Sequence, residues 1–331
     1  MGSMGNLTSV LLSYENLIHA VSGAAGSTVA LSIFYPLDVI RTYQQVTSEK
    51  TEERRSPSPR RNDSKKRSNQ VSSAWIEVAK DIVAKGGLGA LYNGMGAVNK
   101  SVCVSNFVYF YVYHALKKLA QTHGFTQKPV LNLVLGMLAG TVNVLATTPL
   151  WVANTRIKLQ GTKTDESENA ETLQKTFYKG LIDCMVKIAK EEGVRALWSG
   201  TLPSLILVFN PAIHWAVYET LKSNMSNKTG FLNSALYLFL ISAMAKCVAS
   251  ITTYPLQLLQ NRLRAKWYNT DQKHLQISMI AYFRNILKTQ GVKGLFRGLE
   301  VKLWQTVLTA AFMFVIYEKI NARILRLVLN K

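Results

Sequence analysis

The sequence predicts an all-α integral membrane protein in which six transmembrane helices form three tandem repeats of about a hundred residues each. A string that opens with proline and leucine recurs as PLDVIR from residue 36, PLWVANTR from 149 and PLQLLQNR from 255, at intervals of 113 and 106 residues. A landmark of two glycines around an aromatic residue follows each string, at 87–94, 193–200 and 291–298. Uncharged stretches long enough to cross a bilayer complete the pattern.

These uncharged stretches are the evidence for transmembrane helices. Residues 16–37, 129–155 and 196–218 carry no formal charge over 22, 27 and 23 residues, each enough for a helix to span the hydrocarbon core. Shorter runs cover 101–116 and 303–317, and the run from 229 to 261 is interrupted only by Lys246. The six spans form three units, which we place at 14–121, 128–225 and 231–326.

The basic composition fits this architecture. The 331 residues carry a formal charge of +20, which would attract a nucleic acid, an anionic lipid or an anionic solute. Of the 39 Lys and Arg residues, 29 lie within 41–100, 156–200 and 262–302, in or beside the three long loops. Six spans would put both termini on one side of the membrane and these loops on the other.

The odd-numbered spans share a proline near their end. The first span is predicted over about 17–46, and Pro36, Pro149 and Pro255 are expected to bend the odd helices because proline lacks an N–H and its ring clashes with the preceding turn. Residues 47–72 follow, with eight Lys or Arg against four acids. This composition predicts a disordered loop, although its Ser-Pro and Arg content also resembles RNA-binding tails.

A short surface helix and an even-numbered span complete each repeat. In the first repeat, Trp75, Val78 and Ile82 have the spacing of an amphipathic helix that lies on the membrane surface. Isoleucines occupy the same place before the next two glycine landmarks, at 188 and 286. The even spans are predicted at about 98–116, 203–221 and 301–320.

Each even span ends in an aromatic-led polar cluster, which begins Tyr113-His114, Tyr218-Glu219 and Tyr317-Glu318. Together with the proline strings and the glycine landmarks, these clusters resemble the mitochondrial carrier family, whose signatures are P-x-[DE]-x-x-[KR] on odd helices and [FY]-[DE]-x-x-[KR] on even helices. The resemblance extends from about Leu17 to Leu325. It implies a pseudo-threefold mitochondrial-carrier barrel of six helices around a central cavity that opens alternately to each side of the membrane.

The resemblance also implies two gates. Asp38 and Arg41 keep the charged pair of the first signature, and Gln45 lies where the family braces this gate. Uncharged residues replace the pair in the other repeats: Trp151, Asn154, Gln257 and Gln260. We therefore expect polar and aromatic contacts to contribute more to closing this gate than ion pairs. The second gate would use Tyr218, Glu219, Lys222, Tyr317 and Glu318, and it is incomplete because His114 and Asn321 replace an acid and a base.

Within the family, strings such as SNFVYFY at 105–111 and FNPAI at 209–213 resemble peroxisomal carriers of adenine-containing cofactors. We therefore expect a multi-pass protein of the peroxisomal membrane that exchanges CoA, FAD, NAD or AMP-type nucleotides. The family's mitochondrial and plastid carriers of NAD, FAD or folate share the tryptophan of the second proline string. A mitochondrial inner-membrane carrier of NAD, nucleotides or folate is therefore the alternative.

Helix phase within the family nominates the residues that would contact the solute. The usual contact level lies eleven and twelve residues before the aligned tyrosines, which selects Ser101, Val102, Ile206, Leu207, Gln305 and Thr306. Isoleucine and leucine at this level suit a flat adenine face. Asn106, Asn210 and Lys246 are expected to add hydrogen bonds or phosphate-binding charge, with Arg156 just below them. Alternatively, Asn210 satisfies a backbone kinked at Pro211, and Lys246 pairs with a backbone carbonyl.

No catalytic motif is present in the sequence, which lacks a Walker loop, a nucleophile elbow and a Cys/His set for a metal. The prediction is a transporter rather than an enzyme, with no resident cofactor because the cofactors are its cargo. Expected partners are these anionic solutes, membrane lipid and the peroxisomal import machinery, with no nucleic acid. A membrane-anchored protein that binds RNA or a scaffold through 47–72 is a more distant alternative, because it explains the charge but not the threefold signature.

Overall fold

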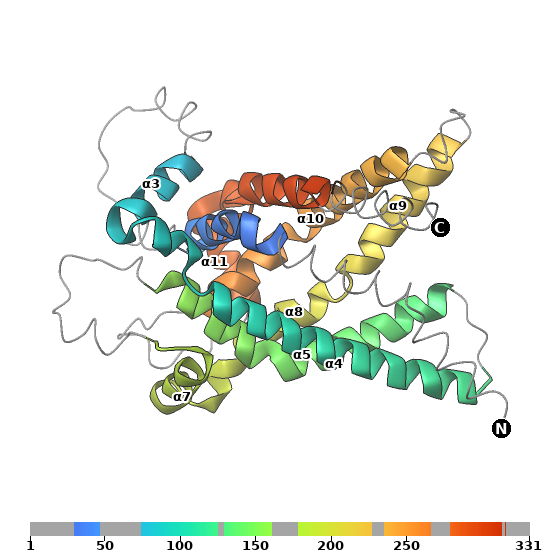
Figure 1. The fold of residues 1–331 in the computed structure, drawn as a ribbon, viewed down its shortest axis with the longest axis horizontal. Helices are drawn as coiled ribbons and strands as arrows, with labels where there is room; N and C mark the ends of the chain where they lie inside the picture. Colours follow the sequence, from blue (N-terminus) through green and yellow to red (C-terminus); the bar gives the residue numbers. More distant parts are fainter. Residues whose placement is uncertain are drawn as a thin grey trace, which may run out of the picture.

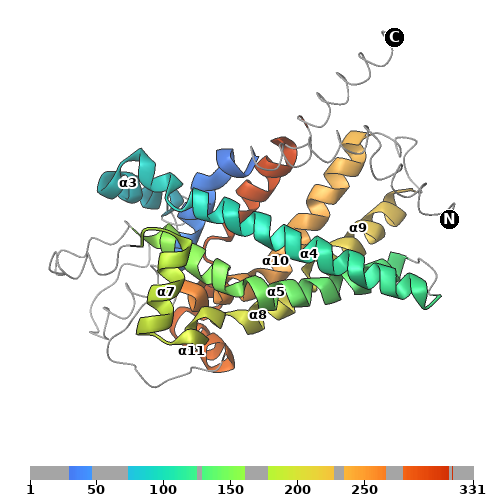
Figure 2. The same ribbon diagram turned by 60° about the horizontal axis from the view of Figure 1, so that its bottom comes forward.

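The computed structural model describes residues 30–46, 74–124, 129–160, 178–226, 235–265 and 279–312, together with Val315. Helices make up nearly all of this part of the chain, in which no strand occurs. The long helices run across the molecule, and the short helices α3, α7 and α11 gather at one end of it, toward the left of Figures 1 and 2. The predicted all-α architecture is confirmed.

Each repeat contains an odd-numbered long helix, a short helix and an even-numbered long helix. The odd helices are 30–46, α5 (Pro129–Leu159) and α10 (Ala235–Ala265). The short helices are α3 (Ala74–Gly86), α7 (Leu181–Glu191) and α11 (Met279–Leu295), and the first two are followed by the 3₁₀ turns η1 (Leu88–Tyr92) and η2 (Val194–Trp198). The even helices are α4 (Met95–Thr122), the pair α8 (Thr201–Leu207) and α9 (Asn210–Ser226), and a last helix over 299–312.

Three helical stretches of the described chain are long and apolar enough to cross a membrane, namely Pro129–Leu159, Val194–Asn224 and Leu236–Ala265. At 28 residues, α4 also has the length for the predicted second span. The first and last predicted spans lie partly outside the described residues, and the predicted loop over 47–72 lies entirely outside them.

The prolines of the odd helices do not end them. Both α5 and α10 continue to Leu159 and Ala265, well past Pro149 and Pro255. A proline cannot donate to the carbonyl four residues earlier, so Pro149 deprives the oxygen of Leu145 of its helical partner. The indole N–H of Trp198, from the second glycine landmark, donates to this oxygen over 3.0 Å. One recurring motif thus restores a hydrogen bond that the other interrupts.

Replacing this donor is expected to destabilise the protein. Trp198→Phe keeps an aromatic ring but leaves the Leu145 oxygen without its donor, at a cost of about 1 kcal/mol. Thermal unfolding of the detergent-purified protein measures the loss. Trp304→Phe is the matched control, because Trp304 is 56% exposed on the last helix. Equal melting temperatures for Trp198→Phe and the wild type would contradict this role.

The even span of the second repeat, predicted at about 203–221, is divided into α8 and α9. Between α8 and α9, the N–H groups of Val208 and Phe209 donate to carbonyls three residues earlier, over 3.2 Å each. Pro211 accounts for the break, because it has no N–H to donate and its ring clashes with the carbonyl of Leu207. The predicted span is present, within the apolar stretch Val194–Asn224, and it is broken at the proline where the sequence suggested a kinked backbone.

Three glycines bring neighbouring repeats together. Each precedes an even helix with φ between 78° and 82°, a conformation that favours glycine: Gly94, Gly200 and Gly298. A Cβ on the first would lie 3.2 Å from Ile157 of the second repeat, and one on the next 3.1 Å from the Gln260 oxygen of the third. A Cβ on the last would lie 2.9 Å from the Tyr254 hydroxyl of its own repeat and 3.4 Å from Gln44 Oε1 of the first repeat. These glycines therefore lie at contacts of the first repeat with the second, of the second with the third, and of the third with the first.

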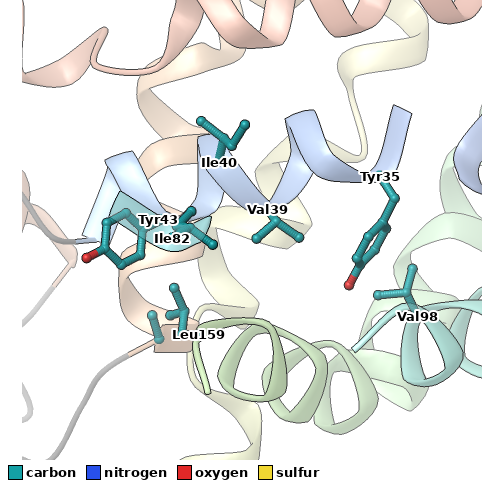
Figure 3. Close-up of a cluster of buried hydrophobic side chains, with 8 residues drawn as sticks. Tyr35, Val39, Ile40, Tyr43, Ile82, Val98 and Leu159 are labelled. Carbon is teal, nitrogen blue, oxygen red and sulfur yellow. The ribbon is translucent and has the colours of Figure 1, made fainter. Parts of the chain in front are cut away.

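Buried apolar clusters hold the short helices to the long ones. In the first cluster, Tyr35 and Val39 of the helix 30–46 point toward Val98 of α4 and the end of α5 (Figure 3). The three aligned isoleucines of the short helices are at most 3% exposed: Ile82, Ile188 and Ile286. The predicted short helix in the first repeat is confirmed as α3, and its apolar face packs into this cluster.

Candidate binding cavity

A cavity of about 410 Å³ lies between helices of all three repeats. Its volume falls within the roughly 300–1,000 Å³ that small-molecule sites occupy. The odd helices provide most of the lining, and the break between α8 and α9 and the start of the last helix complete it. The lining residues are Asp38, Arg41, Thr42, Trp151, Asn154, Thr155, Lys158, Leu207, Asn210, Lys246, Ser250, Gln257, Gln260, Asn261, Arg264, Lys302 and Thr306.

The charge of this cavity is strongly unbalanced. Its lining contains one carboxylate, that of Asp38, against five cationic side chains: Arg41, Lys158, Lys246, Arg264 and Lys302. Like charges in a site shielded from bulk water repel one another, and a concave site lined by one sign of charge concentrates counter-ions. The cavity is therefore suited to an anionic solute.

Asp38 ties the first repeat to the second. Its carboxylate forms an ion pair with Lys158 of α5 and lies 3.7 Å from Arg41, one turn along its own helix. Arg41 in turn donates to Gln257 Oε1 of α10 over 3.1 Å and lies 5.9 Å above the ring of Tyr254. The first repeat is thus bound to both of its neighbours at one level of the barrel.

Gln45 forms a second connection between the first and third repeats. It is fully buried, and its Nε2 donates to the hydroxyl of Tyr254 over 3.0 Å. Its Oε1 accepts from Asn261 Nδ2 over 2.6 Å, and its backbone oxygen accepts from Arg262 Nε over 2.7 Å. These three bonds engage both polar atoms of the buried amide and the backbone carbonyl of the same residue.

The second and third repeats are joined through Ser204 of α8. Its hydroxyl accepts from Gln260 Nε2 over 2.7 Å and from Arg264 Nη2 over 3.1 Å. Arg156, 2% exposed, binds both carboxylate oxygens of Glu192, one over 2.8 Å, and donates to the backbone oxygen of Arg264 over 3.4 Å. Hydrogen bonds and an ion pair therefore link every adjacent pair of repeats around one end of the cavity.

Sequence comparison agrees with this threefold arrangement. The family model described as mitochondrial carrier protein matches three consecutive segments, residues 13–124, 125–229 and 232–327. The chain belongs to this family. Members of the family are transporters rather than enzymes, so the chain is a multi-pass membrane carrier.

Known relatives include carriers of the peroxisomal membrane. The carrier is 43% identical to the peroxisomal membrane protein PMP34 of Mus musculus over 94% of both chains. It is 29% identical to the peroxisomal nicotinamide adenine dinucleotide carrier of Arabidopsis thaliana, over 92% of this chain and 95% of the relative. It is 28% identical to the peroxisomal adenine nucleotide carrier 1 of Glycine max, over 93% and 91%. This likeness supports the predicted peroxisomal membrane over the mitochondrial inner membrane.

Many of the residues nominated from the sequence line the carrier's cavity. Among the nominated solute contacts these are Leu207, Asn210, Lys246 and Thr306, and among the gate residues they are Asp38, Arg41, Trp151, Asn154, Gln257 and Gln260. Asn210 donates to the Thr253 hydroxyl over 3.1 Å. Asn154 is 2% exposed, and neither atom of its amide has a partner among the described residues.

Other nominated residues lie outside the cavity lining. The buried hydroxyl of Ser101 has no hydrogen-bond partner among the described residues, and neither has the buried Oε1 of Gln305. Asn106 is exposed on α4, and Ile206 is 39% exposed on α8. Arg156 is held by Glu192 rather than facing the cavity.

The residues predicted to form the second gate are described only in part, because Tyr317 and Glu318 fall outside the described residues. In α9, the ammonium group of Lys222 lies 5.8 Å above the ring of Tyr218, and Glu219 is exposed. Hydrogen bonds between repeats also occur away from Asp38 in the described residues: Ser105 of α4 bonds Asn143 of α5, and His214 of α9 lies 3.3 Å from the Ser242 oxygen of α10.

Sequence reasoning missed three cavity cations. It expected a weakly charged gate, but Lys158, one helical turn beyond Asn154, gives Asp38 a second cation. Lys158 and Arg264 lie nine residues after the prolines of their repeats, as Gln45 does in the first. Extending that alignment would have found both. Lys302 lies one turn before Thr306. It was not nominated as a cavity residue because it immediately precedes the uncharged run 303–317 and was taken as the limit of that run.

Proposed function

We propose that this carrier exchanges adenine-containing nucleotides and cofactors, namely AMP, NAD, FAD and CoA, across the peroxisomal membrane by alternating access. We also propose that its three repeats extend over residues 14–121, 128–225 and 231–326. The observation that carries the proposal is the cavity lined by five cations and one carboxylate. The printed names of two relatives, an NAD carrier and an adenine nucleotide carrier, support the same solute class.

The cavity combines the two chemical features that such a solute requires. Phosphate oxygens are strong acceptors for Lys and Arg, and charge-assisted hydrogen bonds are about twice as strong as neutral ones. Trp151 and Leu207 add apolar surface to the same lining, and an aromatic or aliphatic face can stack against a purine. A small dicarboxylate would satisfy the charge but would leave this apolar surface unused.

Reconstitution into liposomes tests the proposal. Vesicles loaded with unlabelled AMP are expected to take up labelled AMP, NAD, FAD or CoA with saturation, because outward movement of one anion returns the cavity to the other side. Malate, citrate and free amino acids are expected to give uptake at the level of protein-free liposomes. Robust malate exchange without exchange of any adenine compound would overturn the proposal.

The mitochondrial alternative is supported by the 29% identity to nicotinamide adenine dinucleotide transporter 2, mitochondrial, of Arabidopsis thaliana. Fluorescence localisation of the tagged carrier separates the two. Peroxisomal delivery would require recognition by the peroxisomal import machinery, and co-localisation with a peroxisomal matrix marker is the expected result. Co-localisation with a mitochondrial inner-membrane marker would favour the alternative.

A further inference from the structure

Three of the five cavity cations are held by partners within the protein. Lys158 is paired with Asp38, Arg41 is held by Asp38 and Gln257, and Arg264 donates to Ser204. The two others differ. No hydrogen bond or ion pair with another described residue involves the ammonium group of Lys246 or of Lys302.

The two lysines approach the cavity from different helices of the third repeat. Lys246 projects from α10, one turn before Ser250, which also lines the cavity. Lys302 lies near the start of the last helix, where its backbone oxygen accepts from the hydroxyl of Thr306, another lining residue. Both ammonium groups thus face a common space between α10 and the last helix.

The surrounding charge makes an unbound Lys302 unfavourable. The charged groups that act on it are Asp38 and Arg41 of the helix 30–46, Lys158 of α5 and Lys246 of α10. Asp38 is the sole carboxylate among them and is already shared by two other cations. An unpaired cation inside a membrane protein costs several kcal/mol and marks an ion pathway or a functional site.

We propose that Lys246 and Lys302 together form the phosphate subsite of the cavity, and that Lys302 makes the carrier select solutes with two negative charges on the phosphate end, a phosphomonoester or a pyrophosphate. This assignment rests on the proposed function, since it takes the solute to be a nucleotide-type anion. The ammonium groups of Lys246 and Lys302, which have no hydrogen-bond or ion-pair partner among the described residues, match the two negative charges of such a phosphate group. A singly charged phosphodiester leaves one of them without a counter-charge.

AMP and 3′,5′-cyclic AMP test this assignment because they share the base and ribose but differ in phosphate charge. At pH 7.5 the phosphate of AMP is mainly a dianion, since its second pKa is about 6, and cyclic AMP carries one negative charge. The wild-type carrier is expected to prefer AMP. In Lys302→Gln, the KM for AMP should rise about tenfold and that for cyclic AMP much less, so that discrimination between them collapses.

Three further variants complete the experiment. Lys302→Arg keeps the charge and should keep the preference for AMP, and Lys246→Gln should weaken AMP binding in the same direction as Lys302→Gln. Lys293→Gln is the matched control, because Lys293 is exposed in the same repeat and outside the cavity. Stabilisation of the detergent-purified variants by AMP against thermal unfolding gives a binding readout that is independent of transport.

The outcomes are distinguishable. A Lys302→Gln carrier with wild-type KM for AMP and intact discrimination against cyclic AMP would overturn the subsite while leaving the proposed function in place. A fall in kcat for both solutes, with KM unchanged, would assign Lys302 to the gate and overturn it too. Failure of the wild type to bind or exchange any adenine nucleotide would overturn the proposed function and the subsite together.

Discussion

Asp38→Asn is expected to reduce exchange by more than about tenfold while the protein still inserts into the membrane. Asp38 is the single carboxylate among the described lining residues, and its ion pair with Lys158 joins the first two repeats, while Arg41 lies 3.7 Å away on the same helix. We predict that these contacts close the gate. Removing one partner of a largely buried pair costs a few kcal/mol, because the remaining cations lose their counter-charge. The gate-closed conformation would therefore be disfavoured. Initial rates of AMP exchange in liposomes at matched protein content measure the effect.

A double-mutant cycle shows whether the pair acts as a unit. Lys158→Gln should also slow exchange, and adding it to Asp38→Asn should cost less than the sum of the separate losses, because the double variant has no unpaired partner. Arg41→Ala should impair exchange as well, since it removes the contacts to Gln257 and Tyr254. Additive losses in the cycle, or wild-type rates in all single variants, would remove this ion pair from the gate.

Arg156→Gln is expected to lower the free energy of unfolding by about 3 kcal/mol, the low end of the range for breaking a buried ion pair. The Arg156 side chain is 2% exposed and binds both oxygens of Glu192, whose side chain is 23% exposed. This pair fastens the end of α5 to the end of α7. Thermal unfolding of the purified protein should show a fall in melting temperature, while the KM for AMP in liposomes stays close to that of the wild type.

Glu192→Gln is the matched variant, because it removes the charge of the other partner outside the cavity lining. It should destabilise the protein in the same direction, less strongly because Glu192 is nearer to solvent. The measurement also tests the nomination of Arg156 as a solute contact. A large rise in KM for AMP with an unchanged melting temperature in Arg156→Gln would show that Arg156 binds the solute instead.

The repeat architecture could be predicted from the sequence because its signals lie within single helices. Proline strings, glycine landmarks and uncharged runs recur in order, and each reflects a local requirement: a proline lacks an N–H, Gly298 needs a positive φ, and a helix in lipid needs apolar residues. Ile82 was likewise visible as part of a helical stripe and is 1% exposed in the fold. A kink at Pro211 was considered from the sequence, but the full separation of α8 from α9 was not, because proline alone does not decide between a bend and a break: α5 and α10 continue past Pro149 and Pro255.

Pairings between helices were decided only by the tertiary structure. Lys158 reaches Asp38 across 120 residues of sequence, and Arg41 reaches Gln257 across 216. Which side chains meet depends on the rotation and separation of packed helices and on the reach of each side chain, and spacing along one helix determines neither. For the same reason the sequence showed that the chain is rich in lysine. Only the packed helices showed that Lys246 and Lys302 line the cavity without a hydrogen-bond or ion-pair partner among the described residues, and that Arg156 is bound by Glu192 outside the lining.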